Sequence, residues 1–312
     1  MDSKQLEISL GTDASGNLEF AKKSREAAKE YTWLYHCTDT TAAESIIKKR
    51  EMWLSNLRAV NDKDEANRID LKNYKDKFYI GSFTYDPEIP REHWAEYGTL
   101  RNGVLIGFKQ DWFKCEPQFV MPNGTRIDDP AISPTSMFKS LKDPLLNPMR
   151  NPLIKYSVEG FGFYKVVYDD DLMVRLQASG WLNGNKADEI NAVIPEVAGI
   201  VKKKKGLCSR AGSSSYEKNW EEEKEVRLKI RLEKYCTEEA PSKLRIPLTD
   251  AAFDELVLEF SPEFPEDDKS EFLKKVHNLL PESTIVNSKG QKYSIGLGLE
   301  CGRMQWYNWY TA

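Results

Sequence analysis

Cysteine and histidine are scarce in this chain of 312 residues. There are five cysteines, isolated from one another, and only three histidines. No C-x-x-C pair and no Cys/His cluster occurs, so the sequence predicts no zinc or other metal site. Isolated cysteines of this kind are typical of free, buried thiols in a reducing compartment.

Long hydrophobic runs are also missing. No window of about 18 apolar residues is found, so the sequence predicts no membrane span. The first 20 residues lack the basic and apolar regions of a signal peptide. These two absences predict a cytoplasmic protein without a membrane partner.

The chain has no excess of positive charge. Its net charge of −4 argues against general affinity for nucleic acid. A local basic patch, formed by Lys202 to Lys205 with Lys274 and Lys275, would still suffice for transient contact with a nucleic-acid substrate. The lysine run at 202–205 is more typical of a solvated helix end.

What is present is a globular composition with clear secondary-structure signals, 40% hydrophobic and 30% charged. Helices are expected at 17–31 with Asn17 as N-cap, at 41–50 with a capping box of Thr41 and Glu44, at 187–206 closed by Gly206, and at 265–280. A short helix is expected at 92–103. Strands are expected at 32–36, 51–56, 77–86, 104–109, 162–170, 243–248, 254–260, 283–290 and 293–299, and a charged turn followed by a strand at 220–232.

Three groups of residues are candidates for chemistry. His36 ends the expected strand at 32–36, directly before a helix, where ligands often bind at the rim of a sheet; a histidine with a satisfied hydrogen bond is the alternative. Glu223 and Glu225 are two apart at the start of a strand, so both carboxylates and Arg227 are expected on one face. Such a pair can hold a sugar hydroxyl and stabilise positive charge on a ribose ring, whereas a solvated acidic face is the alternative.

An aromatic pair is the third group. Trp94 and Tyr97 lie three apart, on one face of the expected short helix. They predict either core packing or an aromatic wall for a flat heterocycle.

Several of these stretches together resemble a known family. "LYHCTDTTAAESIIKKREMWLSNLRAVNDKDE", "YIGSFTYD", "HWAEYGTLRNGVLIGFK", "YKVVYDD" and "KNWEEEKEVRL" occur in an order similar to the prokaryotic family called domain of unknown function 2971. The resemblance covers roughly residues 31–295. The chain departs from that family at Cys37, where an aromatic residue is frequent, and at Val226, which replaces a tryptophan. The family is in turn distantly similar to the ADP-ribosyltransferase superfamily.

The resemblance implies an α+β fold with a mixed, mainly antiparallel, split β-sheet core flanked by helices. It implies a helical arm at 1–30 and one catalytic-like domain at 31–312, with a proline-rich insertion at about 115–155. The first superfamily element falls on His36 and Thr38, with the backbone of Cys37 holding the nicotinamide carboxamide. Ser55 or Ser82 supplies the second element, and these alternatives stay open.

The remaining roles concern NAD, which is expected as the substrate cofactor. Glu225 would be the principal carboxylate, Glu223 its helper, and Arg227 a neighbour on the same face. His36 would donate a hydrogen bond to the nicotinamide-side ribose, and Trp53 or Tyr97 would stack on the nicotinamide. Trp94 and Arg227 are further candidates for cofactor binding.

The resemblance thus implies an NAD-dependent ADP-ribosyltransferase, acting as a toxin or anti-phage effector on a protein or nucleic acid. An antitoxin or defence-system partner is expected with that role. Two alternatives stay open, namely a binding module for a nucleotide or partner without turnover, and a hydrolase acting on NAD or nucleic acid.

Overall fold

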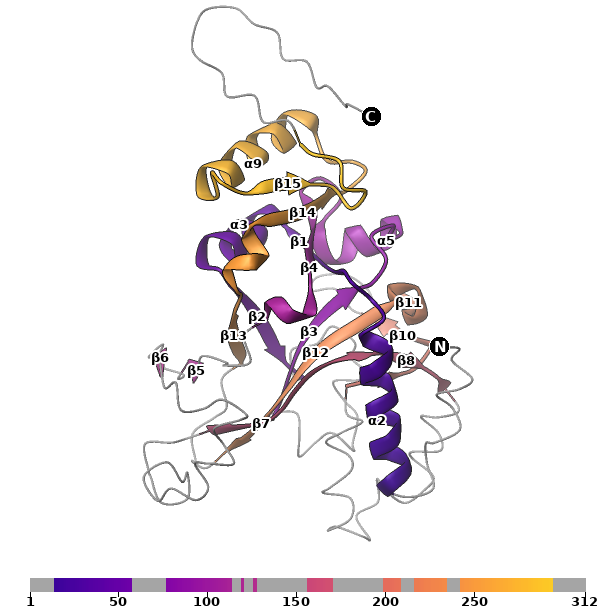
Figure 1. The fold of residues 1–312 in the computed structure, drawn as a ribbon. Helices are drawn as coiled ribbons and strands as arrows, with labels where there is room; N and C mark the ends of the chain where they lie inside the picture. The colour runs from indigo at the N-terminus through magenta and orange to yellow at the C-terminus, as the bar shows by residue number, and fades with distance from the viewer. Residues whose placement is uncertain are drawn as a thin grey trace, which may run out of the picture. The chain divides into compact units, whose positions relative to one another are not determined.

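The structure is a computed structural model, and it describes residues 14–57, 77–113, 119–120, 126–127, 156–170, 199–208, 216–234 and 242–293. These residues form an α+β fold whose strand pairs are mostly antiparallel (Figure 1). The chain divides into two compact units, and each is described by itself. Unit 1 comprises Met1–Thr32, Met52–Tyr85 and Phe113–Pro247, and unit 2 comprises Trp33–Glu51, Asp86–Trp112 and Leu248–Ala312.

Unit 1 is built on five neighbouring strands. Their order is β13 (Lys243–Pro247), β2 (Glu51–Asn56), β3 (Phe78–Thr84), β12 (Glu225–Lys234) and β7 (Tyr156–Lys165). β12 is antiparallel to both β3 and β7. It alternates apolar Val226, Leu228 and Ile230 with charged residues, and these three are fully buried.

Smaller elements complete unit 1. Three two-stranded pairs belong to this unit. The pair β8 (Val167–Tyr168) and β9 (Val201–Lys202) is parallel, whereas β10 (Lys205–Cys208) with β11 (Tyr216–Asn219) and β5 (Phe119–Val120) with β6 (Arg126–Ile127) are antiparallel. A 3-10 turn, η6 (Trp220–Glu223), leads into β12.

The N-terminal helix α2 (Ala14–Ala28) belongs to unit 1 and packs on β7 (Figure 1). Phe20 and Ala21 join Tyr164, Ile200 and Val201 in one hydrophobic cluster. The helix is therefore packed into the core of unit 1. It begins before Asn17, so the N-cap predicted at that residue is wrong.

Unit 2 has four neighbouring strands, β1 (Leu34–Asp39), β4 (Gly103–Phe108), β14 (Glu255–Phe260) and β15 (Thr284–Val286). Only the pair β14–β15 is parallel. Its helices are α3 (Thr40–Lys49), α5 (Arg91–His93) continued by the π-helix η4 (Trp94–Gly98), the 3-10 turns η5 (Gln110–Trp112) and η7 (Asp250–Phe253), and α9 (Glu266–Leu279).

Two predictions about the first strand and helix of unit 2 are wrong. His36 lies in the middle of β1, paired with Ile106, and not at the end of the strand. The N-cap of α3 is Asp39, whose carboxylate accepts a hydrogen bond from the Ala42 N–H at 2.8 Å. An aspartate directly before the helix is a strong cap, so Thr41 is not used as one.

The helix predicted at 187–206 is wrong at its C-terminal end. Val201–Lys202 and Lys205–Cys208 are strands, and Gly206 lies within β10 instead of capping a helix. Ile200 and Val201 are fully buried in the unit 1 core, and this packing outweighs the local helical spacing. Residues 187–198, most of the predicted insertion and the strand expected at 293–299 beyond Tyr293 lie outside the described residues. The same holds for 61–74, where the sequence predicts a charged turn leading into a helix.

A candidate site around Glu223 and Glu225

The two glutamates meet because of a tight turn before β12. Glu223 ends η6, Lys224 adopts a left-handed conformation with φ of 47°, and Glu225 begins the strand. The carboxylates converge on one ammonium group, with Lys202 Nζ at 3.2 Å from Glu223 Oε2 and 3.3 Å from Glu225 Oε2. The expected meeting of the pair is confirmed, although a turn produces it and not an alternating strand.

Two further cations bind the outer oxygens of this pair. Lys218 Nζ lies 2.7 Å from Glu223 Oε1, and Arg227 Nε lies 2.7 Å from Glu225 Oε1. Both glutamate side chains are only 5% exposed. The alternative of a solvated acidic face is therefore wrong, as is the solvated position expected for Lys202, which is buried.

Arg227 is fixed from a second side by the turn at Gly199. Its guanidinium donates to the Gly199 carbonyl at 2.9 Å. Gly199 has φ of +74°, a conformation that favours glycine because no Cβ is present. The turn thus aims a carbonyl at the guanidinium and orders Arg227 against Glu225.

Aromatic rings surround the cations. The ring of Trp220, fully buried, lies 4.3 Å from Lys202 Nζ and 4.7 Å from Lys218 Nζ. The indole N–H of Trp220 has no hydrogen-bond acceptor among the described residues. The Tyr168 hydroxyl donates to Glu225 Oε2 at 3.4 Å.

The electrostatic environment keeps both glutamates ionised. Burial raises the pKa of Glu225, but Arg227 and Lys202 outweigh it and hold this pKa well below its usual range, with help from hydrogen bonds of Arg227 and Ser82. Glu223 has a lowered pKa because Lys202 and Lys218 outweigh both its burial and the neighbouring Glu225. Burial and the two carboxylates raise the pKa of Tyr168 well above its ordinary value.

Ser82 connects the buried carboxylate to the surface. It pairs with Arg227 across β3 and β12, and Thr84 pairs with Glu225, so these side chains share a face of the sheet. Ser82 is exposed, and its hydroxyl hydrogen-bonds to Glu225. This contact joins a residue of the predicted second element to the predicted principal carboxylate.

Trp53 and Ser55 lie on the same face. Ser55 pairs with Ile80, two residues before Ser82, and Trp53 is two residues before Ser55. The side chains on the opposite face, Met52 and Leu54, are fully buried. Six of the predicted site residues are thus gathered on or beside one face of unit 1: Trp53, Ser55, Ser82, Glu223, Glu225 and Arg227.

The other predicted residues belong to unit 2. His36 is partly buried, while Cys37 and Thr38 are buried in β1. Trp94 is 3% exposed and packs with Tyr35, Cys37 and Leu105, which favours its core-packing alternative over an aromatic wall. Tyr97 is partly buried, 4.7 Å from the ring of His93. The convergence of His36 with Glu225 stays a prediction.

Sequence reasoning missed Tyr168, Lys202 and Lys218 as members of the cluster. Lys202 was hidden in a run of four lysines, three of which are exposed. The available signal was the pair Ile200–Val201, which predicts a buried segment directly before it.

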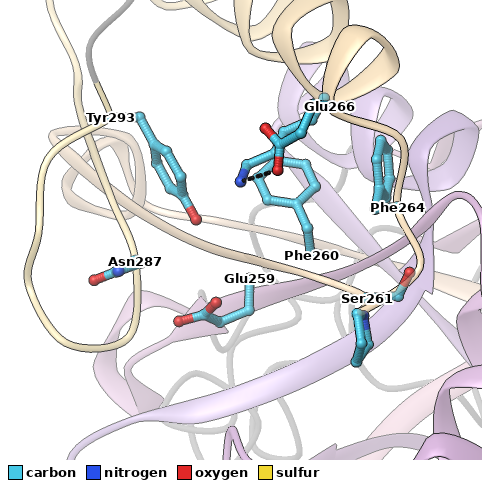
Figure 2. A pocket seen from close by; sticks show the side chains of 9 residues that line it. Glu259, Phe260, Ser261, Phe264, Glu266, Asn287 and Tyr293 are labelled. Carbon is cyan, nitrogen blue, oxygen red and sulfur yellow. Dashed lines mark hydrogen bonds and ion pairs between the residues drawn. The ribbon is translucent and has the colours of Figure 1, made fainter. Parts of the chain in front are cut away.

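Unit 2 has a pocket of its own, with a volume of about 170 Å³, between the end of β14, the start of α9 and Tyr293 (Figure 2). The ammonium of Lys269 lies 5.4 Å from the Phe260 ring, 5.6 Å from the Tyr293 ring and 3.5 Å from Glu266. On another side, Glu259 accepts hydrogen bonds from the Ser288 N–H and hydroxyl. The pocket thus holds the chain's own ammonium group, and no residue predicted as functional lines it.

No family model, curated protein or solved structure matches this chain. Within the described ranges, no helix is both long and apolar enough to cross a membrane.

Proposed function

We propose that the chain is an NAD-dependent ADP-ribosyltransferase with Glu225 as its principal carboxylate. The observation that supports this most directly is the hydrogen bond between Ser82 and Glu225. The resemblance assigns these residues to separate elements, and they lie on neighbouring strands with Trp53 and Ser55 on the same face. The ADP-ribosyltransferase-like form of the α+β fold belongs to the same proposal.

In the proposed reaction, the bond between ribose C1′ and the nicotinamide nitrogen breaks, and its electron pair leaves with nicotinamide. Positive charge develops on the ribose ring until a nucleophile of the acceptor forms the new bond to C1′ and gives up a proton. Glu225, held ionised, stabilises that charge and accepts a hydrogen bond from the ribose 2′-hydroxyl. The ribose approaches from the side of Ser82, because that side chain is exposed.

The supporting groups have separate roles. Arg227 and Lys202 orient the Glu225 carboxylate, and Glu223 fixes Lys202 between the two acids. Trp53 or Tyr97 stacks on nicotinamide. The proposed role of His36 is a hydrogen bond to the ribose. Because His36 belongs to unit 2, the single variant His36→Ala tests this role separately from the residues of unit 1.

Labelled NAD tests the proposal. Wild type should transfer the label to a macromolecule, and Glu225→Gln should reduce transfer by about a hundredfold, the effect of one well-placed charge-stabilising group. Glu221→Gln is the matched control because Glu221 is exposed in the same turn. Glu225→Gln removes the acid that pairs with Arg227 and leaves Lys202 with Glu223 alone, so it can unfold the protein. Ser82→Ala therefore provides a second test at an exposed position. Full transfer by folded Glu225→Gln and Ser82→Ala would refute the assignment.

A binding module without turnover is the second candidate. It is favoured by one observation, the neutralisation of Glu225 by Arg227 and Lys202, because a compensated carboxylate stabilises a developing cation less well. A binder would show saturable thermal stabilisation by a nucleotide without nicotinamide release. Nicotinamide release with no labelled acceptor would instead indicate a hydrolase.

The proposed setting is a cytoplasmic toxin or anti-phage effector with an antitoxin or defence-system partner. Expression should then arrest bacterial growth, and Ser82→Ala or His36→Ala should relieve the arrest at equal protein level. Arrest that persists with both variants would contradict the transferase as its cause.

A further inference from the structure

The sheet of unit 1 carries an exposed tryptophan beside two cations at its β13 edge. Leu244 and Ile246 of β13 are fully buried, so the alternating residues Lys243 and Arg245 lie on the other face. Lys243 Nζ is 5.8 Å and the Arg245 guanidinium 5.3 Å from the centre of the Trp53 ring. We call these three residues the Trp53 platform.

The exposure of Trp53 is unusual for this chain. Its side chain is 39% exposed, and it is the one large hydrophobic residue that is exposed among those whose burial is described. Lys243 is exposed and Arg245 partly so. A flat ring at the surface with two positive charges over it offers an aromatic surface and two anion contacts at one place.

This combination fits single-stranded nucleic acid. An unpaired base can stack on the indole while neighbouring phosphates contact the cations, as in proteins that bind single strands without sequence preference. A duplex hides its base faces within its own stack. An acidic peptide would use the cations but not the ring. The net charge of −4 limits such binding to local positive patches of this kind.

The platform also lies on the face that carries the candidate site. Trp53 shares its face with Ser55, which pairs with β3, and β3 presents Ser82 on that face beside Glu225. Neighbouring strands are about 5 Å apart. One nucleotide step along the face would therefore reach from the platform toward Ser82.

We propose that the Trp53 platform binds single-stranded nucleic acid and that this strand is the acceptor of ADP-ribose. The binding part stands on the platform alone, whereas the acceptor part rests on the proposed function. Trp53 then serves the acceptor, and the nicotinamide stacks elsewhere.

The binding test is fluorescence anisotropy with a labelled oligo-dT of about ten nucleotides, a length within the usual site size. Trp53→Ala should weaken the Kd about tenfold or more, and Trp53→Phe should retain most of the affinity because a ring remains. In a plot of log K against the logarithm of the salt concentration, the double variant Lys243→Gln/Arg245→Gln should have a slope that is smaller in magnitude by about 1.4. This is the contribution of two phosphate contacts to a single strand. The control Lys203→Gln/Lys204→Gln removes as many exposed charges from the same unit and should leave both quantities unchanged.

Absent oligonucleotide binding, tighter binding of duplex, or variants of the platform that bind like wild type would each overturn the proposal. Folded Glu225→Gln should bind the oligonucleotide normally and modify it about a hundredfold less than wild type. Platform-dependent binding without any transfer from labelled NAD would keep the docking site but overturn both the acceptor role and the transferase. Transfer to protein alone, with no oligonucleotide labelled, would overturn the acceptor role and keep the transferase.

Discussion

Lys202 is the residue on which the buried charge cluster depends. Its ammonium lies between two carboxylates that would otherwise repel each other in a dry environment. Its neighbour Lys203 has the same side chain but is exposed. The two lysines form a natural pair for comparing a buried and a solvated charge.

Replacing Lys202 with methionine should lower the free energy of unfolding by about 3–5 kcal/mol, because Glu223 and Glu225 lose their shared cation. Lys203→Met should change it by about 0.5 kcal/mol or less. Urea denaturation measures both values. Equal small effects would mean that the carboxylates do not need Lys202.

The lowered pKa values of Glu223 and Glu225 predict acid sensitivity. Below a pH of about 4.5, these carboxyls are protonated in the unfolded chain but still ionised in the folded protein, because their pKa values are lower there. Stability therefore falls as the pH falls toward the folded pKa values. Between pH 5.5 and 7, on the same reasoning, the pair should contribute a constant amount. Denaturation curves from pH 7 to pH 3 test this, and Glu225→Gln should flatten the acid limb.

Part of this site could be predicted from the sequence. The E-x-E-x-R spacing is local, so it indicated that Glu223, Glu225 and Arg227 lie together. Lys202 and Tyr168 come from β9 and β8, and their approach depends on a strand pairing that no local pattern encodes. Trp94 was ambiguous because core and binding-site aromatics have the same helical spacing.

At the scale of elements, the N-cap of α3 can be tested, because the sequence and the structure assign it to different residues. The sequence predicted Thr41 with Glu44, and the structure assigns the cap to Asp39. Asp39→Ala should therefore cost about 1 kcal/mol of stability, whereas Thr41→Ala should cost little. Thermal denaturation of the two variants decides between the caps, and a larger loss in Thr41→Ala would contradict the observed one.

The packing of helix α2 gives a second prediction at the scale of elements. Phe20 is fully buried against Tyr164 and Val201, and Ser24 donates to the Lys165 carbonyl at 2.8 Å. Phe20→Ala should lower the free energy of unfolding by about 3–5 kcal/mol. Lys22→Ala, an exposed change in the same helix, is the control. A small loss in Phe20→Ala would contradict the packing of α2 against β7.

Strands were easier to predict than helix ends. β2 coincides with its expected range, and β14 differs by one residue, because a short apolar run marks both. The segment 199–206 failed because its valine and lysines also fit the end of a helix. Only its packing in the core of unit 1 decides the outcome.

At the scale of the whole molecule, the α+β fold class was predicted from the family resemblance and not from the composition. The mostly antiparallel strand pairs agree with that class. The division into two units has no linker-like signal, because each unit is assembled from separated stretches of the chain. The candidate residues are divided in the same way, with the glutamates in unit 1 and His36 in unit 2. A function that needs both the glutamates and His36 must therefore be tested by substitutions in each unit.

The exposed hydroxyl of Ser82 touches a carboxylate that solvent otherwise barely reaches. A cysteine introduced there would carry its sulfur at an exposed position next to Glu225. Its alkylation rate would report the charge beneath it, since a nearby anion disfavours the reactive thiolate. Any molecule that settled on this face would shield the sulfur, so occupancy could be followed before the identity of the ligand is known.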